Sequence, residues 1–261
     1  MATNNGIKSK DRVQAHGEVF TPDSIVNEMI DLVDEEFNKE TEGISEEAKL
    51  WHYIDSTVLE PTCGDGQFLI RLLYRKLVAA SKLPVEQREL AALHAVSSIY
   101  GVDIQEDNVV EARERMYNIF IGNEVETFDN KEPRTFNICF KDLGITISEK
   151  LRKAVRFVLD ANIVVGNTLV TECDGLYDKT TLPENKPVFF NSWKFNDNKV
   201  KAVFEFLHEG KALPLYLDTQ SKEVDFLNID TVWDGYINPI EKLNNSAELE
   251  GQESDEDVWD F

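Results

Sequence analysis

Length, composition and charge narrow the classes of protein to which this chain can belong. Its 261 residues suit one α/β domain with additions, and a hydrophobic content of 42% is enough for a sizeable core. No stretch reaches the roughly 18 to 20 consecutive apolar residues of a membrane helix, and residues 1–10 lack the apolar segment of a secretory signal. Three scattered cysteines without a C-x-x-C pair predict reduced thiols, no structural zinc and a cytoplasmic location.

The formal net charge of −22 argues against a chain that binds DNA over most of its own surface. Affinity for DNA comes largely from neutralised phosphates, so DNA-binding surfaces are expected to be basic. Part of the acidity lies in residues 246–261, which contain no lysine or arginine, and we expect these residues to form a disordered acidic tail. This tail either is solvated or docks into a basic groove of a partner.

The expected elements alternate along the chain. After an N-terminal arm at 1–16, Thr21-Pro22-Asp23-Ser24 begins a helix whose apolar residues recur at helical spacing, and an acidic loop at 38–47 follows. Strands are expected at 56–60, 98–104, 137–140 and 161–165, and helices at 67–81, 83–95, 107–120 and 150–159. This alternation predicts a parallel sheet with helices on both faces. Residues 171–245 show no comparable pattern, so we expect an irregular C-terminal extension there.

The strongest local feature is the string V-L-E-P-T-C-G-D-G-Q-F-L at residues 58–69. A short apolar strand runs into a turn with two glycines and then into a helix. Glycines allow a ligand to approach the backbone, and the first turn of a helix offers free N–H groups. Open α/β sheets bind ligands at the carboxyl ends of parallel strands, which is where this turn would lie.

This string resembles motif I of the DNA N6-adenine methyltransferases. Three other segments resemble further motifs of that family, in the family's order: G-E-V-F-T-P at 17–22 (motif X), I-Y-G-V-D-I at 99–104 (motif II) and I-V-V-G-N-T-L at 163–169 (motif III). They most resemble the γ-type enzymes of restriction–modification systems and phages. The resemblance implies a Rossmann-like S-adenosylmethionine-dependent methyltransferase fold at 17–170, with a doubly wound, mostly parallel sheet.

The resemblance also implies a set of S-adenosylmethionine contacts. Asp103 would accept hydrogen bonds from the ribose hydroxyls, Glu60 would face the methionine ammonium, and Asn167 would accept from the adenine amino group. The implied cofactor-binding residues are Phe20, Thr21, Pro22, Glu60, Pro61, Cys63, Gly64, Gly66, Asp103, Ile104 and Asn167. Taken without the resemblance, Asp103 and Asn167 would be turn residues, Phe20 a core aromatic and Cys63 a small packing residue.

The family's catalytic motif IV, N/D-P-P-Y/F, does not occur in the chain. In such enzymes the asparagine and a carbonyl hold the adenine amino group, and the aromatic ring stacks on the flipped-out base. Two partial matches exist, at residues 165–169 and at Asn238-Pro239, and each lacks the stacking ring. No catalytic residue is therefore assigned, and the four histidines show no metal-ligand spacing.

Two functions follow as expectations. In the first, the chain is the S-adenosylmethionine-binding component of a DNA adenine-N6 methyltransferase, and a second methyltransferase or specificity subunit supplies catalysis and DNA recognition. In the second, it is an inactive, methyltransferase-like acidic protein that binds or inhibits a restriction–modification protein or another DNA-binding protein. A methyltransferase for another substrate is disfavoured by the F-T-P segment at 20–22, which is typical of the DNA enzymes.

Overall fold

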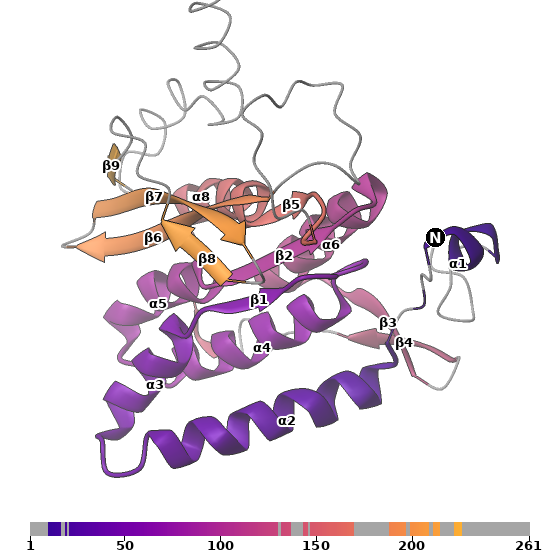
Figure 1. Cartoon of the computed structure of the whole chain (residues 1–261). Helices are drawn as coiled ribbons and strands as arrows, with labels where there is room; N and C mark the ends of the chain where they lie inside the picture. The colour runs from indigo at the N-terminus through magenta and orange to yellow at the C-terminus, as the bar shows by residue number, and fades with distance from the viewer. Residues whose placement is uncertain are drawn as a thin grey trace, which may run out of the picture.

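The computed structural model describes residues 10–16, 19, 21–129, 132–136, 143–145, 147–169, 188–196, 199–208, 211–214 and 222–225 (Figure 1). Three strands form a parallel sheet in the order β1-β2-β5: β1 (Val58–Glu60), β2 (Ile99–Asp103) and β5 (Ile163–Val165). Leu59 lies opposite Tyr100, and Val102 lies opposite Val164. The expected α/β class with a parallel sheet is confirmed.

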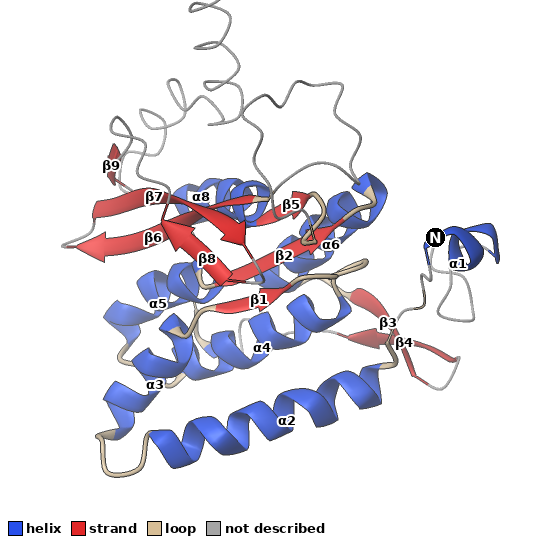
Figure 2. Cartoon of the chain, in the orientation of Figure 1, coloured by secondary structure: helices blue, strands red, loops and turns tan. Residues whose placement is uncertain are grey.

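Helices connect these strands, as the alternation predicted (Figure 2). Between β1 and β2 lie α4 (Gln67–Ser81) and α5 (Val85–Ser97), and between β2 and β5 lie α6 (Glu106–Ile121) and α8 (Glu149–Asn162). The expected boundaries of α4 are met at both ends, and Pro84 is the N-cap of α5. Helix α8 extends through Asn162, so β5 is shorter than the strand expected at 161–165.

The region before β1 differs from the expectation. Helix α1 (Lys10–His16) lies within the expected arm, and α2 (Asp23–Glu40) is the helix expected after Thr21-Pro22. The expected acidic loop at 38–47 is wrong at both ends, because α2 continues to Glu40 and α3 (Glu46–Asp55) begins at Glu46. Ser45 caps α3 by accepting a hydrogen bond from the Ala48 N–H. Acidic residues in the first turn of α3 favour the helix through its dipole.

Two further strand regions were not expected. An antiparallel hairpin joins β3 (Val125–Asp129) to β4 (Glu132–Phe136), and the strand expected at 137–140 lies outside the described residues. The segment expected to be irregular contains a second sheet, made of β6 (Phe189–Asn196), β7 (Lys199–His208), β8 (Lys211–Pro214) and β9 (Lys222–Asp225). All its pairings are antiparallel, and Asn196 lies opposite Lys199.

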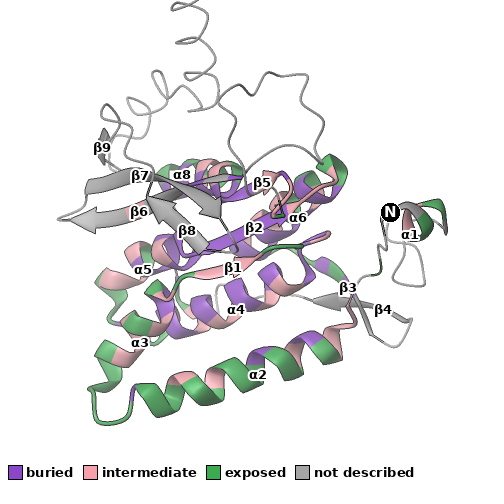
Figure 3. Cartoon of the chain, in the orientation of Figure 1, coloured by how far each residue is buried: buried purple, intermediate pink, exposed green. Residues whose placement is uncertain are grey.

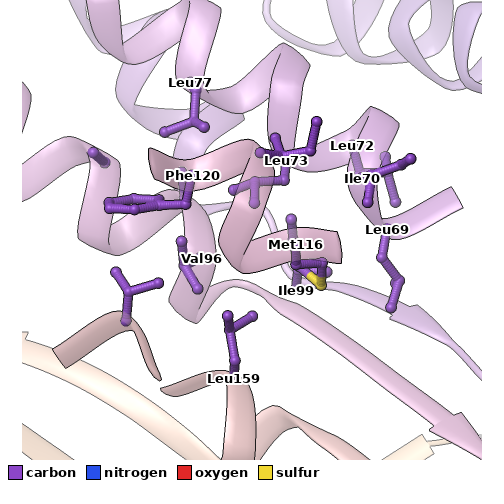
Figure 4. Packing of buried hydrophobic residues seen from close by; sticks show 14 of the residues in the cluster. Leu69, Ile70, Leu72, Leu73, Leu77, Val96, Ile99, Met116, Phe120 and Leu159 are labelled. Carbon is purple, nitrogen blue, oxygen red and sulfur yellow. The ribbon is translucent and has the colours of Figure 1, made fainter. Parts of the chain in front are cut away.

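Different elements pack against the two faces of the parallel sheet. On one face, Ile99 and Ile163 pack into the main core with α4, α5, α6 and α8; Figure 4 shows Leu69, Leu73 and Met116 in this cluster. On the other face, Tyr100 and Val102 pack against Val188 and Phe190 at the start of β6. We expected helices on both faces. Among the described residues, the second face is instead covered by this aromatic strand segment.

The described helices include none that is both long enough and apolar enough to cross a membrane.

Lys76 of α4 is a buried lysine that links three elements. Its side chain is 2% exposed, and its Nζ donates to the carbonyls of Tyr53 and Ile54, to both Ser56 oxygens and to the Ser98 hydroxyl, at 2.5 to 3.2 Å. These acceptors belong to the end of α3, the entry to β1 and the entry to β2. The lysine therefore adds a donor to carbonyls at the end of α3, where the hydroxyls of Ser56 and Ser98 donate as well.

We predict that Lys76→Met lowers the free energy of unfolding by about 3 kcal/mol, because buried acceptors in three elements lose one of their donors or the only one described for them. Burial lowers the pKa of Lys76 to about 7. The unfolded chain, with a lysine pKa of about 10.4, therefore binds more protons between pH 7 and 10, so this lysine should make the native protein more stable as pH rises through that window. The gap between wild type and Lys76→Met should widen accordingly in urea titrations.

The exposed Lys82→Met, which removes the same charge, is the control and should change stability by less than about 0.5 kcal/mol. Equal stability of the two variants would contradict the structural role of Lys76.

Candidate ligand site at the carboxyl edge of the parallel sheet

The turn after β1 is built on two glycines with positive φ. Gly64 has φ 53° and Gly66 has φ 88°, and Gly66 is the N-cap of α4. A Cβ on Gly66 would lie 2.9 Å from the Cβ of Ala112 on α6. The backbone N–H of Cys63 donates to the carbonyl of Val102 at 2.7 Å, which joins the turn to β2. Glycine at 66 therefore permits both the turn and the close approach of α6.

The Asp103 carboxylate, at the end of β2, fixes this turn from the other side. Its Oδ2 accepts from the Gly64 N–H at 3.0 Å, and its Oδ1 accepts from the Gln105 N–H at 2.8 Å and from Asn108 Nδ2 at 3.2 Å. Each donor belongs to the β1 turn or to the start of α6. The carboxylate therefore orders two turns in the structure itself.

The turn after β5 completes the edge. The Gly166 N–H donates to the backbone carbonyl of Asp103 at 3.0 Å, and the Asn167 Oδ1 accepts from the Leu169 N–H at 2.9 Å. The second bond is an Asx turn, in which the side chain holds its own backbone. The expected turn chemistry of Asn167 is thus present, and the residue also lines the cavity described next.

A cavity of about 530 Å³ opens between these three turns and the entry to α2. That volume falls within the range of small-molecule sites, roughly 300 to 1,000 Å³. The described lining residues are Val19, Thr21, Pro61, Thr62, Cys63, Gly64, Asp65, Gln67, Phe68, Asp103, Ile104, Gln105, Asn108, Gly166, Asn167, Thr168 and Leu169. All four sequence segments that carry the family resemblance contribute to it.

The electrostatics of the cavity are acidic. Among the described residues that line it there is no lysine, arginine or histidine, whereas Asp65 and Asp103 are both present. Asp65 forms an ion pair with Arg115 of α6 at 2.7 Å. Arg115 also donates to the Asp65 carbonyl and to Gln67 Oε1, so it holds the β1 turn from behind the cavity. The Asp103 carboxylate, in contrast, is held here by neutral donors.

Two groups at the β1 turn have raised pKa values. Burial, reinforced by the negative charges of Asp103, Glu60 and Asp65, raises the pKa of the Cys63 thiol well above its usual value. Burial also raises the pKa of Glu60, and hydrogen bonds from Thr62 oppose that shift. A thiol held protonated is a poor nucleophile, so the geometry gives Cys63 a packing role beside Gly101, whose added Cβ would lie 3.2 Å from its sulfur.

The structure places most of the predicted site residues around the cavity. Those that line it are Thr21, Pro61, Cys63, Gly64, Asp103, Ile104 and Asn167. Three predicted residues are absent from the described lining, namely Pro22, Glu60 and Gly66. Glu60 turns onto Thr62, whose N–H and hydroxyl donate to its Oε1 at 3.4 Å, and Gly66 lies against α6. Phe20 lies outside the described residues.

Sequence reasoning missed several lining residues. Gln105 and Asn108 occupy the start of α6, and Thr62, Gln67 and Phe68 flank the predicted glycines. Their place in the sequence could have identified some of them. Gln105 and Asn108 follow Asp103 at the end of β2, so they lie at the same edge of the sheet as the predicted residues. The sequence identified segment 163–169 as part of the site. It could not show that Gly166, Thr168 and Leu169 line the cavity, because that depends on the conformation of the turn after β5.

Comparisons with known proteins give no match: no family model, no curated protein and no solved structure is similar to the chain at a significant level. Within the described part of the chain, no group of three or more histidine, cysteine, aspartate or glutamate side chains is arranged to hold a metal ion.

Two glycines with the same φ allow the packing of the β1 turn to be measured. Gly66 and Gly43 both have φ 88°, but an added Cβ on Gly43 meets nothing within 4 Å. We predict that Gly43→Ala costs about 1 kcal/mol of stability, because an L residue is strained in this conformation. Gly66→Ala should cost about 3 kcal/mol, because the methyl group also displaces α6. Chemical denaturation measures both, and equal costs would contradict the packing of α6 on Gly66.

Proposed function

We propose that this chain is the S-adenosylmethionine-binding component of a DNA adenine-N6 methyltransferase of the restriction–modification or phage type. In this proposal the domain has a Rossmann-like methyltransferase fold, and a partner subunit supplies the catalytic motif and the recognition of DNA. The observation that carries the proposal is the cavity at the carboxyl edge of the sheet. Residues from all four motif-like segments, far apart in sequence, line it together.

The charge of the cavity supports this ligand over a nucleotide cofactor. S-adenosylmethionine carries a sulfonium and an ammonium group, so it is net cationic near neutral pH. A dinucleotide would bring a pyrophosphate, which binds either to charged side chains or to the N–H groups at the start of a helix. The described lining offers the Asp103 carboxylate to a cation, whereas a pyrophosphate would find no basic side chain there and only backbone N–H groups. When bound, this cofactor would supply an activated methyl group.

The residues of this chain would bind and orient the cofactor. A carboxylate has about four acceptor positions, and protein donors use three of those on Asp103. Asp103 therefore has about one position left for a ligand hydroxyl, and the amides of Gln105 and Asn108 stand beside it. Ile104, Phe68 and Leu169 provide the apolar part of the lining. Adenine binding by apolar contact is consistent with this distribution.

Catalysis is assigned to a partner because of the sequence of this chain. The N/D-P-P-Y/F tetrapeptide does not occur in it, and its partial match at Asn238-Pro239 lies outside the described residues. A basic partner would also bring the positive surface that DNA binding requires.

The net charge of −22 favours the second function, an inactive methyltransferase-like protein that binds or inhibits a restriction–modification or other DNA-binding protein. Such an acidic surface is complementary to the basic surface of a DNA-binding protein. Cofactor binding distinguishes the two functions, because a protein that acts through its surface charge alone does not need a cofactor-binding cavity.

We predict that calorimetric titration gives micromolar binding of S-adenosylmethionine and at least tenfold weaker binding of NAD⁺. Asp103→Asn, which preserves shape and removes the charge, should weaken S-adenosylmethionine binding about tenfold or more. Asp160→Asn makes the same chemical change at the exposed end of α8 and should bind like wild type. Thermal melts of each variant control for folding.

No heat of binding with a well-folded wild type would overturn the proposal in favour of the inactive acidic protein. Tighter binding of NAD⁺ than of S-adenosylmethionine would overturn the assignment of the ligand.

A further inference from the structure

Helix α2 carries two apolar stripes, and α4 covers one of them. Val26 and Ile30 are buried, at 0% and 2% exposed. Ile25, Met29, Leu32 and Val33, here called the outer stripe, are 43%, 49%, 65% and 62% exposed. At about 100° per residue these four fall within an arc of roughly 100° beside the buried stripe. Figure 3 shows the exposed side of α2 along its length.

The outer stripe is a fixed feature of the surface. Arg71 of α4 forms an ion pair with Asp23, and Arg75 of α4 forms ion pairs with Asp31 and Asp34. These pairs fix the rotation of α2 about its axis, so the outer stripe faces away from α4. The other exposed apolar side chains on the described helices, such as Val85 and Val110, belong to different elements. A continuous apolar stripe about 12 Å long is typical of a contact surface.

Charge limits what can cover this stripe. Exposed Glu28 and Glu35 run along the edge away from α4, whereas Glu36, one turn beyond Leu32, is paired with Lys39. A second copy of the chain would bring the same carboxylates and a net charge of −22. Residues 246–261 are acidic as well. Like charges disfavour both of these occupants, whereas flanking lysines or arginines on an occupant would be complementary.

We propose that the outer stripe of α2 docks an amphipathic helix of a partner protein. The docked helix presents apolar residues at helical spacing, flanked by lysine and arginine. A helix packed along another helix, with apolar anchors and charged flanks, is a common recognition mode. The proposal does not depend on the ligand of the cavity.

The outer stripe lies close in sequence to the candidate site. Thr21, which lines the cavity, is two residues before the first residue of α2. Val19, which also lines it, is 63% exposed. The outer stripe therefore begins four residues after a residue that lines the cavity.

The test uses a fluorescein-labelled synthetic peptide that forms an amphipathic helix, with leucines on one face and lysines flanking them. Fluorescence anisotropy measures its binding to the full chain. Wild type should bind this peptide, and Met29→Gln/Leu32→Gln should weaken binding about tenfold or more. Val85→Gln/Val110→Gln removes two exposed apolar side chains elsewhere and should stay within twofold of wild type. A peptide with glutamates in place of the lysines should not bind.

Several outcomes would overturn the proposal. Absence of peptide binding by wild type would do so. Equal binding by both double variants would do so as well, because it would show that the peptide binds through charge alone.

Two further experiments test other occupants of the stripe. Sedimentation of wild type as a dimer that Met29→Gln/Leu32→Gln dissociates would assign the stripe to a second copy. A photo-crosslinking residue at position 32 that links to the chain's own residues, and not to the peptide, would assign it to this chain. S-adenosylmethionine titration of the same variants should be unchanged, so failure here is distinguishable from failure of the cofactor proposal.

Discussion

The Asp103 carboxylate is the interaction on which the candidate site depends. It accepts from the Gly64 N–H, the Gln105 N–H and the Asn108 side chain, and the backbone carbonyl of the same residue accepts from the Gly166 N–H. One residue thus connects the turns that follow all three parallel strands. Because groups of the chain itself hold the three turns together, binding a ligand would cost less conformational entropy than ordering separate loops. Because three protein donors already bind the Asp103 carboxylate, it has little capacity left to accept hydrogen bonds from a ligand.

The charge distribution divides the proposed activity between two polypeptides. The cavity offers the Asp103 carboxylate and neutral polar groups to a ligand, and the chain as a whole has a net charge of −22. A surface of this kind suits a cationic cofactor and opposes DNA. The outer stripe of α2 then offers a place where a basic partner could join, beside the cavity. Cofactor binding and partner docking rest on separate observations, so either can fail without the other.

Much of the site edge could be predicted from sequence because it is local. The glycine turn, the α4 boundaries and the strand-end position of Asp103 follow from patterns within a few residues. The direction of the Glu60 side chain could not be predicted, because it depends on a hydrogen-bonding choice between Thr62 and the cavity. The role of Gly66 depends on Ala112, which is distant in sequence. Periodicity likewise showed that α2 is amphipathic, but could not show which of its apolar residues α4 covers.

The antiparallel sheet was missed for a related reason. Prolines at 183, 187, 214 and 239 break the segment into short pieces, and short aromatic stretches do not identify a strand without a partner. Strand pairing from β6 to β9 supplies that partner. The contact of Phe190 with the parallel sheet explains why the second face needs no helix among the described residues.

The central claim is that S-adenosylmethionine binds between the three turns at the carboxyl edge of the sheet. Hydrogen–deuterium exchange of the full chain, with and without S-adenosylmethionine, tests it most directly. We predict slower exchange on binding at residues 61–66, 103–108 and 166–169, with exchange at residues 25–33 of α2 unchanged. Protection confined to other segments, or no change at saturating cofactor, would contradict it.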